Sequence, residues 1–107
     1  ADCGQVFNSH IAKQQLEGAI IYGLTAALKG EINVQNGQIV QSNFDDYPML
    51  KLKDTPEINV HLMENHEAPG GLGEAGTPLI GPAVANAVFA ATGKRVRRLP
   101  IRRKDVI

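Results

Sequence analysis

The sequence predicts an α+β fold in which two helices cover a mixed, mostly antiparallel sheet. Three observations support this expectation: an apolar residue that recurs every four positions near the N-terminus, a hairpin turn with alternating flanks, and an alanine-rich helical stretch bounded by proline and glycine. The expected order of elements is β-α-β-β-β-α-β. The 107 residues are expected to form a single domain, 1–107, a length that suffices for one modest hydrophobic core.

The first helix is expected from about residue 9 to residue 29. Asn8 or Ser9 can cap its first turn with a side-chain oxygen. Gly30 fits as the residue that ends it. Between them an apolar stripe follows the helical period, through Leu16, Ile20, Leu24 and Leu28.

Two glycines, Gly18 and Gly23, lie in the interior of this helix. Each costs about 1 kcal/mol of helix stability relative to alanine. We therefore expect the helix to pack closely against another backbone or against a ligand at these positions.

A hairpin is predicted in the segment EINVQNGQIVQ, residues 31–41. Asn36 and Gly37 suit a two-residue type I′ turn, because both positions of that turn require φ > 0. Apolar and polar residues alternate on both sides of the turn. A long connection, 42–56, leads to a further expected strand in 57–65, where the alternation returns.

The second helix is expected to begin at Pro82 and to end just before Gly93. Proline is favoured at the first helical position and glycine just past the end. One side of this helix is apolar, through Ile80, Val84, Val88 and Ala91. A last strand in RVRRLPI, 95–101, would complete the sheet.

The net charge is zero but unevenly distributed. Residues 1–93 hold four Lys/Arg and ten Asp/Glu, a net of −6, whereas residues 94–107 hold seven Lys/Arg and one Asp, a net of +6. A basic tail of this kind could form a small nucleic-acid-binding unit. However, apolar residues interrupt its charges and no aromatic residue is present for base stacking, so no nucleic-acid partner is expected.

The single cysteine, Cys3, excludes an internal disulfide. It also excludes any iron–sulfur cluster built by this chain alone, because such a cluster needs four thiolates. No apolar run approaches the about 20 residues that a membrane span requires. The chain starts with Ala1 rather than methionine, so we expect a processed or excised piece of a longer protein.

The stretch GGLGEAG, Gly70–Gly76, surrounds Glu74 with four glycines. Its letters contain G-x-G-x-x-G, a pattern that marks a dinucleotide site when a strand runs straight into it and a helix follows at once. Here several residues are expected on both sides between the motif and regular structure. No acidic residue lies about twenty positions further on, as that site requires. A small dinucleotide-binding domain is therefore kept only as an alternative.

Glu74 itself admits a second interpretation. Glycine has no side chain, so a carboxylate on this loop can approach a ligand with little obstruction. If water were largely excluded there, the carboxylate could act as a base near neutral pH. A solvent-exposed glutamate in a turn is the simpler alternative.

Other polar candidates carry less information. His10, His61 and His66 form no closely spaced pair, and no metal-ligating set is assigned to the chain. Gln15 could offer a ligand an amide that both donates and accepts hydrogen bonds. An exposed polar helix face is the simpler interpretation of Gln15.

Two segments together resemble a known family: QQLEGAIIYGLTAAL, 14–28, and GGLGEAGTPLIGPAVANAVFAATGKRVRRLPI, 70–101. They are similar to the C-terminal part of the large subunit of the molybdenum hydroxylases, the relatives of xanthine oxidase and aldehyde oxidase. Within this family they resemble the isoquinoline 1-oxidoreductase type, in its β subunit. The D-C-G start, the hairpin and SNFDDYPML follow in the family's order, so the resemblance covers nearly the whole chain.

The resemblance implies roles for five residues. In that family the glutamate of the G-x-G-E loop lies beside the molybdenum and acts as a general base, a role that maps onto Glu74. Gln15 maps onto a glutamine that hydrogen-bonds the pterin, and Gly73 onto the loop that approaches the metal centre. Phe44 and Tyr47 map onto a loop near the substrate funnel, where they are expected wall residues.

The resemblance also implies what lies outside this chain. The cofactor would be molybdopterin, in its cytosine dinucleotide form, bound by the full-length enzyme and not by the isolated fragment, which is expected to be inactive. Expected partners are the remainder of the molybdopterin subunit, a small subunit with a 2Fe–2S cluster, and a small-molecule substrate, either an N-heteroaromatic ring or an aldehyde. Exposed apolar surfaces could lead the fragment to self-associate. The compartment of the full-length enzyme, cytoplasm or periplasm, is not assigned.

One departure from the family pattern concerns the loop itself. Ala75 stands where relatives commonly carry proline after the glutamate. The loop is therefore expected to be less rigid, and the substrate specificity is correspondingly open.

Overall fold

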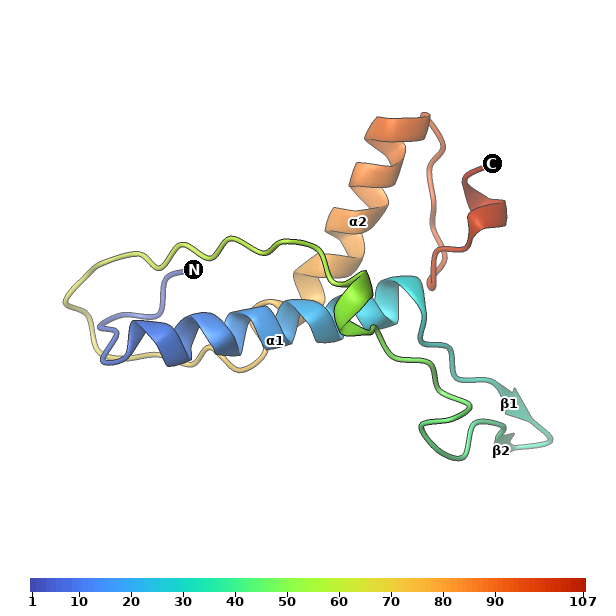
Figure 1. Ribbon diagram of the computed structural model, residues 1–107, viewed down its shortest axis with the longest axis horizontal. Coiled ribbons are helices and arrows are strands. Elements are labelled where there is room, and N and C mark those ends of the chain that lie inside the picture. The colour runs from blue at the N-terminus through green and yellow to red at the C-terminus, as the bar shows by residue number, and fades with distance from the viewer.

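Two helices dominate the computed structural model, which describes all residues, 1–107 (Figure 1). The remaining regular structure is one small antiparallel sheet and two short 3₁₀ helices. The elements in chain order are α1 (Ser9–Leu28), β1 (Val34–Gln35), β2 (Gln38–Ile39), η1 (Leu52–Asp54), α2 (Thr77–Thr92) and η2 (Arg103–Asp105). The fold is α+β, as predicted, but its sheet is confined to one hairpin.

Helix α1 begins where its capping residue predicts. The Asn8 side chain accepts a hydrogen bond of 3.0 Å from the N–H of Ile11, the bond expected of an N-cap. The C-cap is Lys29 rather than the predicted Gly30. Gly30 instead accommodates a neighbouring ring, because a Cβ there would lie 2.5 Å from the hydroxyl of Tyr47.

Helix α2 begins at Thr77 and not at Pro82, where the sequence predicts its start. Pro78 lies in the first turn, where a missing N–H costs no helical hydrogen bond. Pro82 lies inside the helix. The end agrees with the prediction: Gly93 adopts a left-handed conformation with φ 72°, and its N–H donates a hydrogen bond of 2.8 Å to the carbonyl of Phe89.

The hairpin also agrees with the prediction. Asn36 and Gly37 have φ values of 51° and 78°, both positive as a type I′ turn requires. The ladder is short, and its outer pair joins Val34 to Ile39. Both strands are exposed, and the hairpin projects away from the two helices (Figure 1).

The other predicted strands are not present. No strand precedes α1, and residues 57–65 and 95–101 form no ladder. The predicted β-α-β-β-β-α-β order and the mixed sheet beneath two helices are therefore not confirmed. Alternating apolar residues indicate a strand with one buried face. A strand also needs a neighbour for its backbone N–H and C=O groups. In 57–65 that neighbour is only Ala1, which accepts a hydrogen bond of 2.8 Å from the N–H of Met63 and donates one of 2.6 Å to the carbonyl of His61, and this contact is too short to form a ladder.

The N-terminal segment is hydrogen-bonded to the start of the glycine loop, residues 70–76. The N–H of Gly70 donates a hydrogen bond of 2.7 Å to the carbonyl of Cys3. Gly4 takes a positive φ of 71°, and a Cβ there would collide with the carbonyl oxygen of Ala68. In Figure 1 the chain before α2 runs back along α1 to this contact and then returns to the start of α2. The loop is thus anchored before it reaches α2.

Helix α2 meets α1 at small residues. A Cβ at Gly23 would lie 2.7 Å from the carbonyl oxygen of Thr77 and 2.9 Å from the Cβ of Ile80. A Cβ at Gly76 would lie 3.1 Å from that of Ala19. Both distances at position 23 are shorter than real Cβ atoms allow. The close approach of the two helices therefore requires glycine at position 23, as the sequence predicts.

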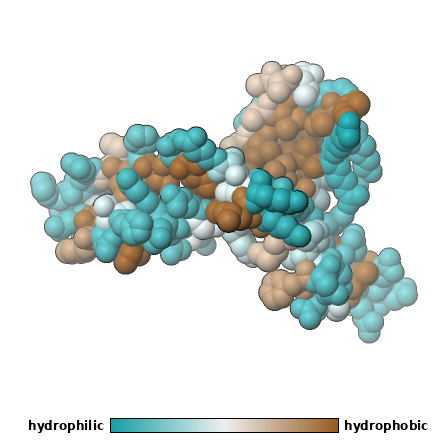
Figure 2. All heavy atoms as spheres, in the orientation of Figure 1, coloured by the Kyte–Doolittle hydropathy of each residue, from teal (hydrophilic) through white to brown (hydrophobic).

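Much of the apolar surface is uncovered. Only 10 of the 107 residues are buried, and six of those lie in α1. The radius of gyration is 16.5 Å, larger than the about 13 Å expected for a compact domain of this length. Helix α2 has no buried residue, and Figure 2 shows apolar side chains gathered over it. Neither helix is both long and apolar enough to span a membrane.

Candidate functional site

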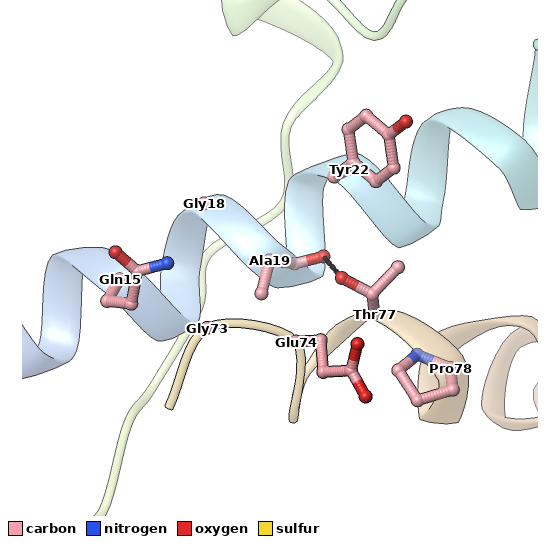
Figure 3. Close-up of a pocket in the computed structure, with 8 residues that line it drawn as sticks. All are labelled: Gln15, Gly18, Ala19, Tyr22, Gly73, Glu74, Thr77 and Pro78. Carbon is pink, nitrogen blue, oxygen red and sulfur yellow. Dashed lines mark hydrogen bonds between the residues drawn. The ribbon is translucent and has the colours of Figure 1, made fainter. Parts of the chain in front are cut away.

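An open cleft of about 580 Å³ lies where the glycine loop meets α1 (Figure 3). Helix α1 forms one wall, and the loop with the first turn of α2 forms the other. The lining residues are Gln15, Gly18, Ala19, Tyr22, Gly73, Glu74, Thr77 and Pro78. The structure therefore brings Gln15, Gly73 and Glu74 to one place, although they are distant in the sequence.

The α1 wall presents Gln15, Gly18 and Tyr22, because positions three and four residues apart share a helix face. Gln15 is exposed, so its amide can donate to and accept from a ligand. A Cβ at Gly18 would meet nothing within 4 Å. This wall is thus a strip of bare backbone between two polar side chains.

The loop wall presents Glu74 just before α2. The carbonyl of Glu74 accepts a hydrogen bond of 2.9 Å from the N–H of Thr77, which ties the loop to the helix. The carboxylate is exposed and takes part in none of the chain's three ion pairs. A Cβ at the preceding Gly73 would meet nothing within 4 Å, so the loop leaves room beside this carboxylate.

Sequence reasoning does not single out Tyr22 and Thr77. Tyr22 follows Gln15 by seven residues, or about two helical turns, and that spacing is a signal by which it could have been found. Thr77 carries no comparable signal. Its hydroxyl donates a hydrogen bond of 3.2 Å to the carbonyl of Ala19, drawn as a dashed line in Figure 3, and this contact depends on where α2 begins.

Phe44 and Tyr47, the expected wall residues of the substrate funnel, do not line this cleft. They lie in the loop that follows the hairpin and line a separate depression of about 270 Å³. Tyr47 is half-buried at the end of α1, against Gly30. Phe44 is 78% exposed. Within this chain neither side chain forms a wall with Glu74, and their role stays a prediction.

The chain supplies no metal-ligating cluster. No three His, Cys, Asp or Glu side chains are grouped so that they could hold a metal ion. The three histidines accordingly give no site.

A dinucleotide site requires a strand that runs into the glycine motif and a helix that follows it, and only the helix is present here. Helix α2 follows Gly76 directly, which is closer than the sequence predicts. No strand runs into the loop, because the only strands are those of the hairpin. Since a dinucleotide site requires the strand as well as the helix, this alternative is not favoured.

The basic tail is partly committed to contacts within the chain. Glu31 forms ion pairs with Arg98, at 3.8 Å, and with Arg102. The guanidinium of Arg95 lies 3.6 Å from the centre of the Phe89 ring. Ile101 is buried. These contacts dock the tail on the helices, and a nucleic-acid function is not favoured.

The sequence profile of the molybdopterin cofactor-binding domain matches residues 1–56, which is more than half of the chain. The chain belongs to this family. The match confirms the resemblance that the motifs indicate. Gln15 and Gly18 lie inside the matched region, and Glu74 lies outside it.

Individual relatives are similar over nearly all of the chain. Identity is 42% over 106 residues to a membrane-bound aldehyde dehydrogenase (pyrroloquinoline-quinone) of Gluconacetobacter polyoxogenes, covering 99% of this chain and 14% of the relative. It is 45% over 101 residues to the isoquinoline 1-oxidoreductase subunit beta of Brevundimonas diminuta, covering 94% and 13%. The crystal structure of quinoline 2-oxidoreductase from Pseudomonas putida 86 has the same fold, with a TM-score of 0.81, 27% identity, and coverage of 94% and 14%. The chain thus spans about one-seventh of the length of these relatives.

Proposed function

We propose that this chain is part of a molybdopterin-dependent oxidoreductase that hydroxylates a carbon atom of an N-heteroaromatic ring or an aldehyde, with oxygen derived from water. The observation that carries the proposal is the meeting of Gln15 and Glu74 in one cleft of a molybdopterin cofactor-binding domain. The names of the relatives, which include isoquinoline and quinoline oxidoreductases and an aldehyde dehydrogenase, support these two substrate classes.

The residues of the cleft fit a pterin cofactor. The cleft volume falls in the range of small-molecule sites, about 300–1,000 Å³. Gly18 and Gly73 leave open space on the two walls. The exposed amide of Gln15 can both donate to and accept from the polar edge of a pterin.

When bound, the cofactor would supply the two-electron oxidation of the substrate. The chain's own contribution is positioning and proton transfer. Gln15 orients the cofactor by hydrogen bonds, and Gly73 lets the loop approach it. Glu74 acts as the general base: its carboxylate, free of any ion pair in the chain, accepts the proton of the water-derived nucleophile.

Two further components belong to this proposal. The cofactor is assigned to the cytosine dinucleotide form. Electrons would leave through a partner subunit with a 2Fe–2S cluster. This chain, with its single cysteine, does not supply the four thiolates that such a cluster needs. The remainder of the molybdopterin subunit would complete the cleft and cover the apolar surface of α2.

The proposal is tested in the full-length polypeptide with its iron–sulfur partner. Glu74→Gln keeps the shape of the side chain and removes the base. We expect the molybdenum content to be unchanged and the turnover of isoquinoline-like substrates or aldehydes to fall by about 10² to 10⁴, the usual contribution of a general base. Glu67→Gln, at an exposed glutamate outside the cleft, is the matched control.

Two results would contradict the proposal at different levels. Full turnover of the Glu74→Gln enzyme with its molybdenum retained would remove Glu74 from the role of base. A wild-type protein that purifies without molybdopterin would exclude the cofactor itself.

A further inference from the structure

We propose that Gly18 is the position at which the bound cofactor lies directly against helix α1, in van der Waals contact with the backbone. This inference rests on the proposed function, because it concerns the occupant of the same cleft. The residue type at position 18 is unfavourable for the helix in which it lies. Glycine in a helix interior is less favourable than alanine, and Gly18 lies in the middle of α1, Ser9–Leu28.

Packing within the chain explains one interior glycine of α1 and not the other. A Cβ at Gly23 would lie 2.7 Å from the carbonyl oxygen of Thr77, so the crossing of the helices requires glycine there. A Cβ at Gly18 would meet nothing within 4 Å. Gly18 also has no positive φ, so its backbone conformation does not require glycine. Neither packing nor backbone conformation within the chain therefore requires glycine at position 18.

The surroundings of Gly18 indicate what that occupant is. Gly18 lies three residues after Gln15 and four before Tyr22, so all three share one face of α1 and line the cleft. Figure 3 shows the amide of Gln15 and the phenol of Tyr22 on either side of this strip of bare backbone. A flat ring can lie against such a strip while flanking side chains hydrogen-bond its polar edge. A pterin has this shape and chemistry.

A side chain at position 18 should therefore act in opposite directions on the helix and on the cofactor. Alanine is the better helix former and nothing in the chain obstructs its Cβ, so the cofactor-free protein should be at least as stable. The same Cβ would occupy the space that the ring needs. If Gly18 instead packed against another protein segment, Gly18→Ala would lower both the stability of the protein and its cofactor content.

The test uses the full-length polypeptide with its partner subunit and measures molybdenum and pterin per protomer, together with the melting temperature of the cofactor-free form. Gly18→Ala is expected to lower both contents severalfold, because the added Cβ takes the space of the ring, and Gly18→Val to lower them further. The melting temperature of the Gly18→Ala form should not fall. Ala26→Val, at an exposed position of α1 outside the cleft, controls for the helix cost of valine.

Gly71→Ala is the matched glycine control. Gly71 is exposed, has no positive φ, and would place its Cβ in open space, but it does not line the cleft. Its variant should keep the full cofactor content. Full content in both Gly18 variants would overturn the inference and leave the proposed function intact, whereas a wild type without molybdopterin would overturn the proposed function. Parallel loss of stability and cofactor in Gly18→Ala would assign Gly18 to protein packing and would also overturn the inference.

Discussion

The hydroxyl of Thr77 donates a hydrogen bond of 3.2 Å to the carbonyl oxygen of Ala19. This bond joins the first turn of α2 to the middle of α1. Glu74 lies three residues before Thr77, on the opposite wall of the cleft from α1. The distance between Glu74 and the α1 wall therefore depends on how firmly the two helices are held together.

Thr77→Val removes this hydrogen bond and keeps the branched shape of the side chain. The local loss should be about 1 kcal/mol, the usual net contribution of one hydrogen bond, which corresponds to a roughly fivefold larger population of the open state. Hydrogen exchange in the full-length protein should show it at the glycine loop and the first turn of α2. Thr92→Val, whose hydroxyl bonds the carbonyl of Val88 within the same helix, should leave the loop unchanged. Equal exchange at the loop in both variants would contradict this role of Thr77.

Gly23→Ala tests how close the two helices lie. The added Cβ would lie 2.7 Å from the carbonyl oxygen of Thr77. Overpacking of this kind costs about 1–3 kcal/mol, which should exceed the gain of about 1 kcal/mol in helix propensity. The cofactor-free full-length protein should therefore lose stability in urea or on heating. Gly18→Ala, with the same chemical change at an open position of the same helix, should not. A stable Gly23→Ala protein would mean that the crossing tolerates a methyl group.

Asp46 should make the loop after the hairpin sensitive to acid. Its carboxylate accepts hydrogen bonds from the N–H groups of Asn43, at 3.0 Å, and Ser42, at 2.8 Å, and these bonds hold the pKa of Asp46 below its ordinary value of 3.8. Because the folded-state pKa is lowered, the stabilisation is present above about pH 4 and is lost as the pH falls through the folded pKa.

Hydrogen exchange at the amides of Ser42 and Asn43 would measure this effect. Asp46→Asn should speed their exchange near neutral pH and remove the change with acid. The neighbouring Asp45→Asn makes the same substitution at a residue whose carboxylate does not bond these amides, and it should behave as wild type. Identical exchange in the two variants would show that Asp46 does not hold the loop.

Phe44 and Tyr47 can be tested separately because their burial differs. Phe44 is 78% exposed, so Phe44→Ala should leave the fold intact. If Phe44 lines the substrate funnel in the full-length enzyme, the variant should raise KM for an isoquinoline-like substrate by roughly tenfold, about 1.4 kcal/mol of binding, with kcat less affected. Leu52→Ala, at a side chain that is 91% exposed, is the control. An unchanged KM would remove Phe44 from the funnel.

The local sequence determined those features that a few neighbouring residues decide. The cap at Asn8, the turn at Asn36 and the end of α2 at Gly93 all lie where they are predicted. Caps and tight turns depend on backbone and side-chain interactions within about four residues. The sequence of a few neighbouring residues is therefore sufficient to predict caps and tight turns.

Pairing between distant segments was not determined in this way. The segment 57–65 alternates like a strand, yet its backbone is bonded only to Ala1, through His61 and Met63, and no ladder forms. Helix α2 begins at Thr77 rather than Pro82, and Thr77 bonds a carbonyl of α1 that lies far away in the sequence. No local pattern carries information about that contact.

In the candidate site, too, the sequence identified individual residues and the tertiary structure decided how they are arranged. Motifs singled out Gln15, Gly73 and Glu74 one by one, and only the crossing of α1 and α2 decided that they line one cleft. Gly18 and Gly23 are alike in the sequence, as two costly glycines in one helix. Five positions turn a helix by about 140°, so Gly23 faces the backbone of α2 and Gly18 faces open space. What lies opposite each glycine was decided by the tertiary structure alone.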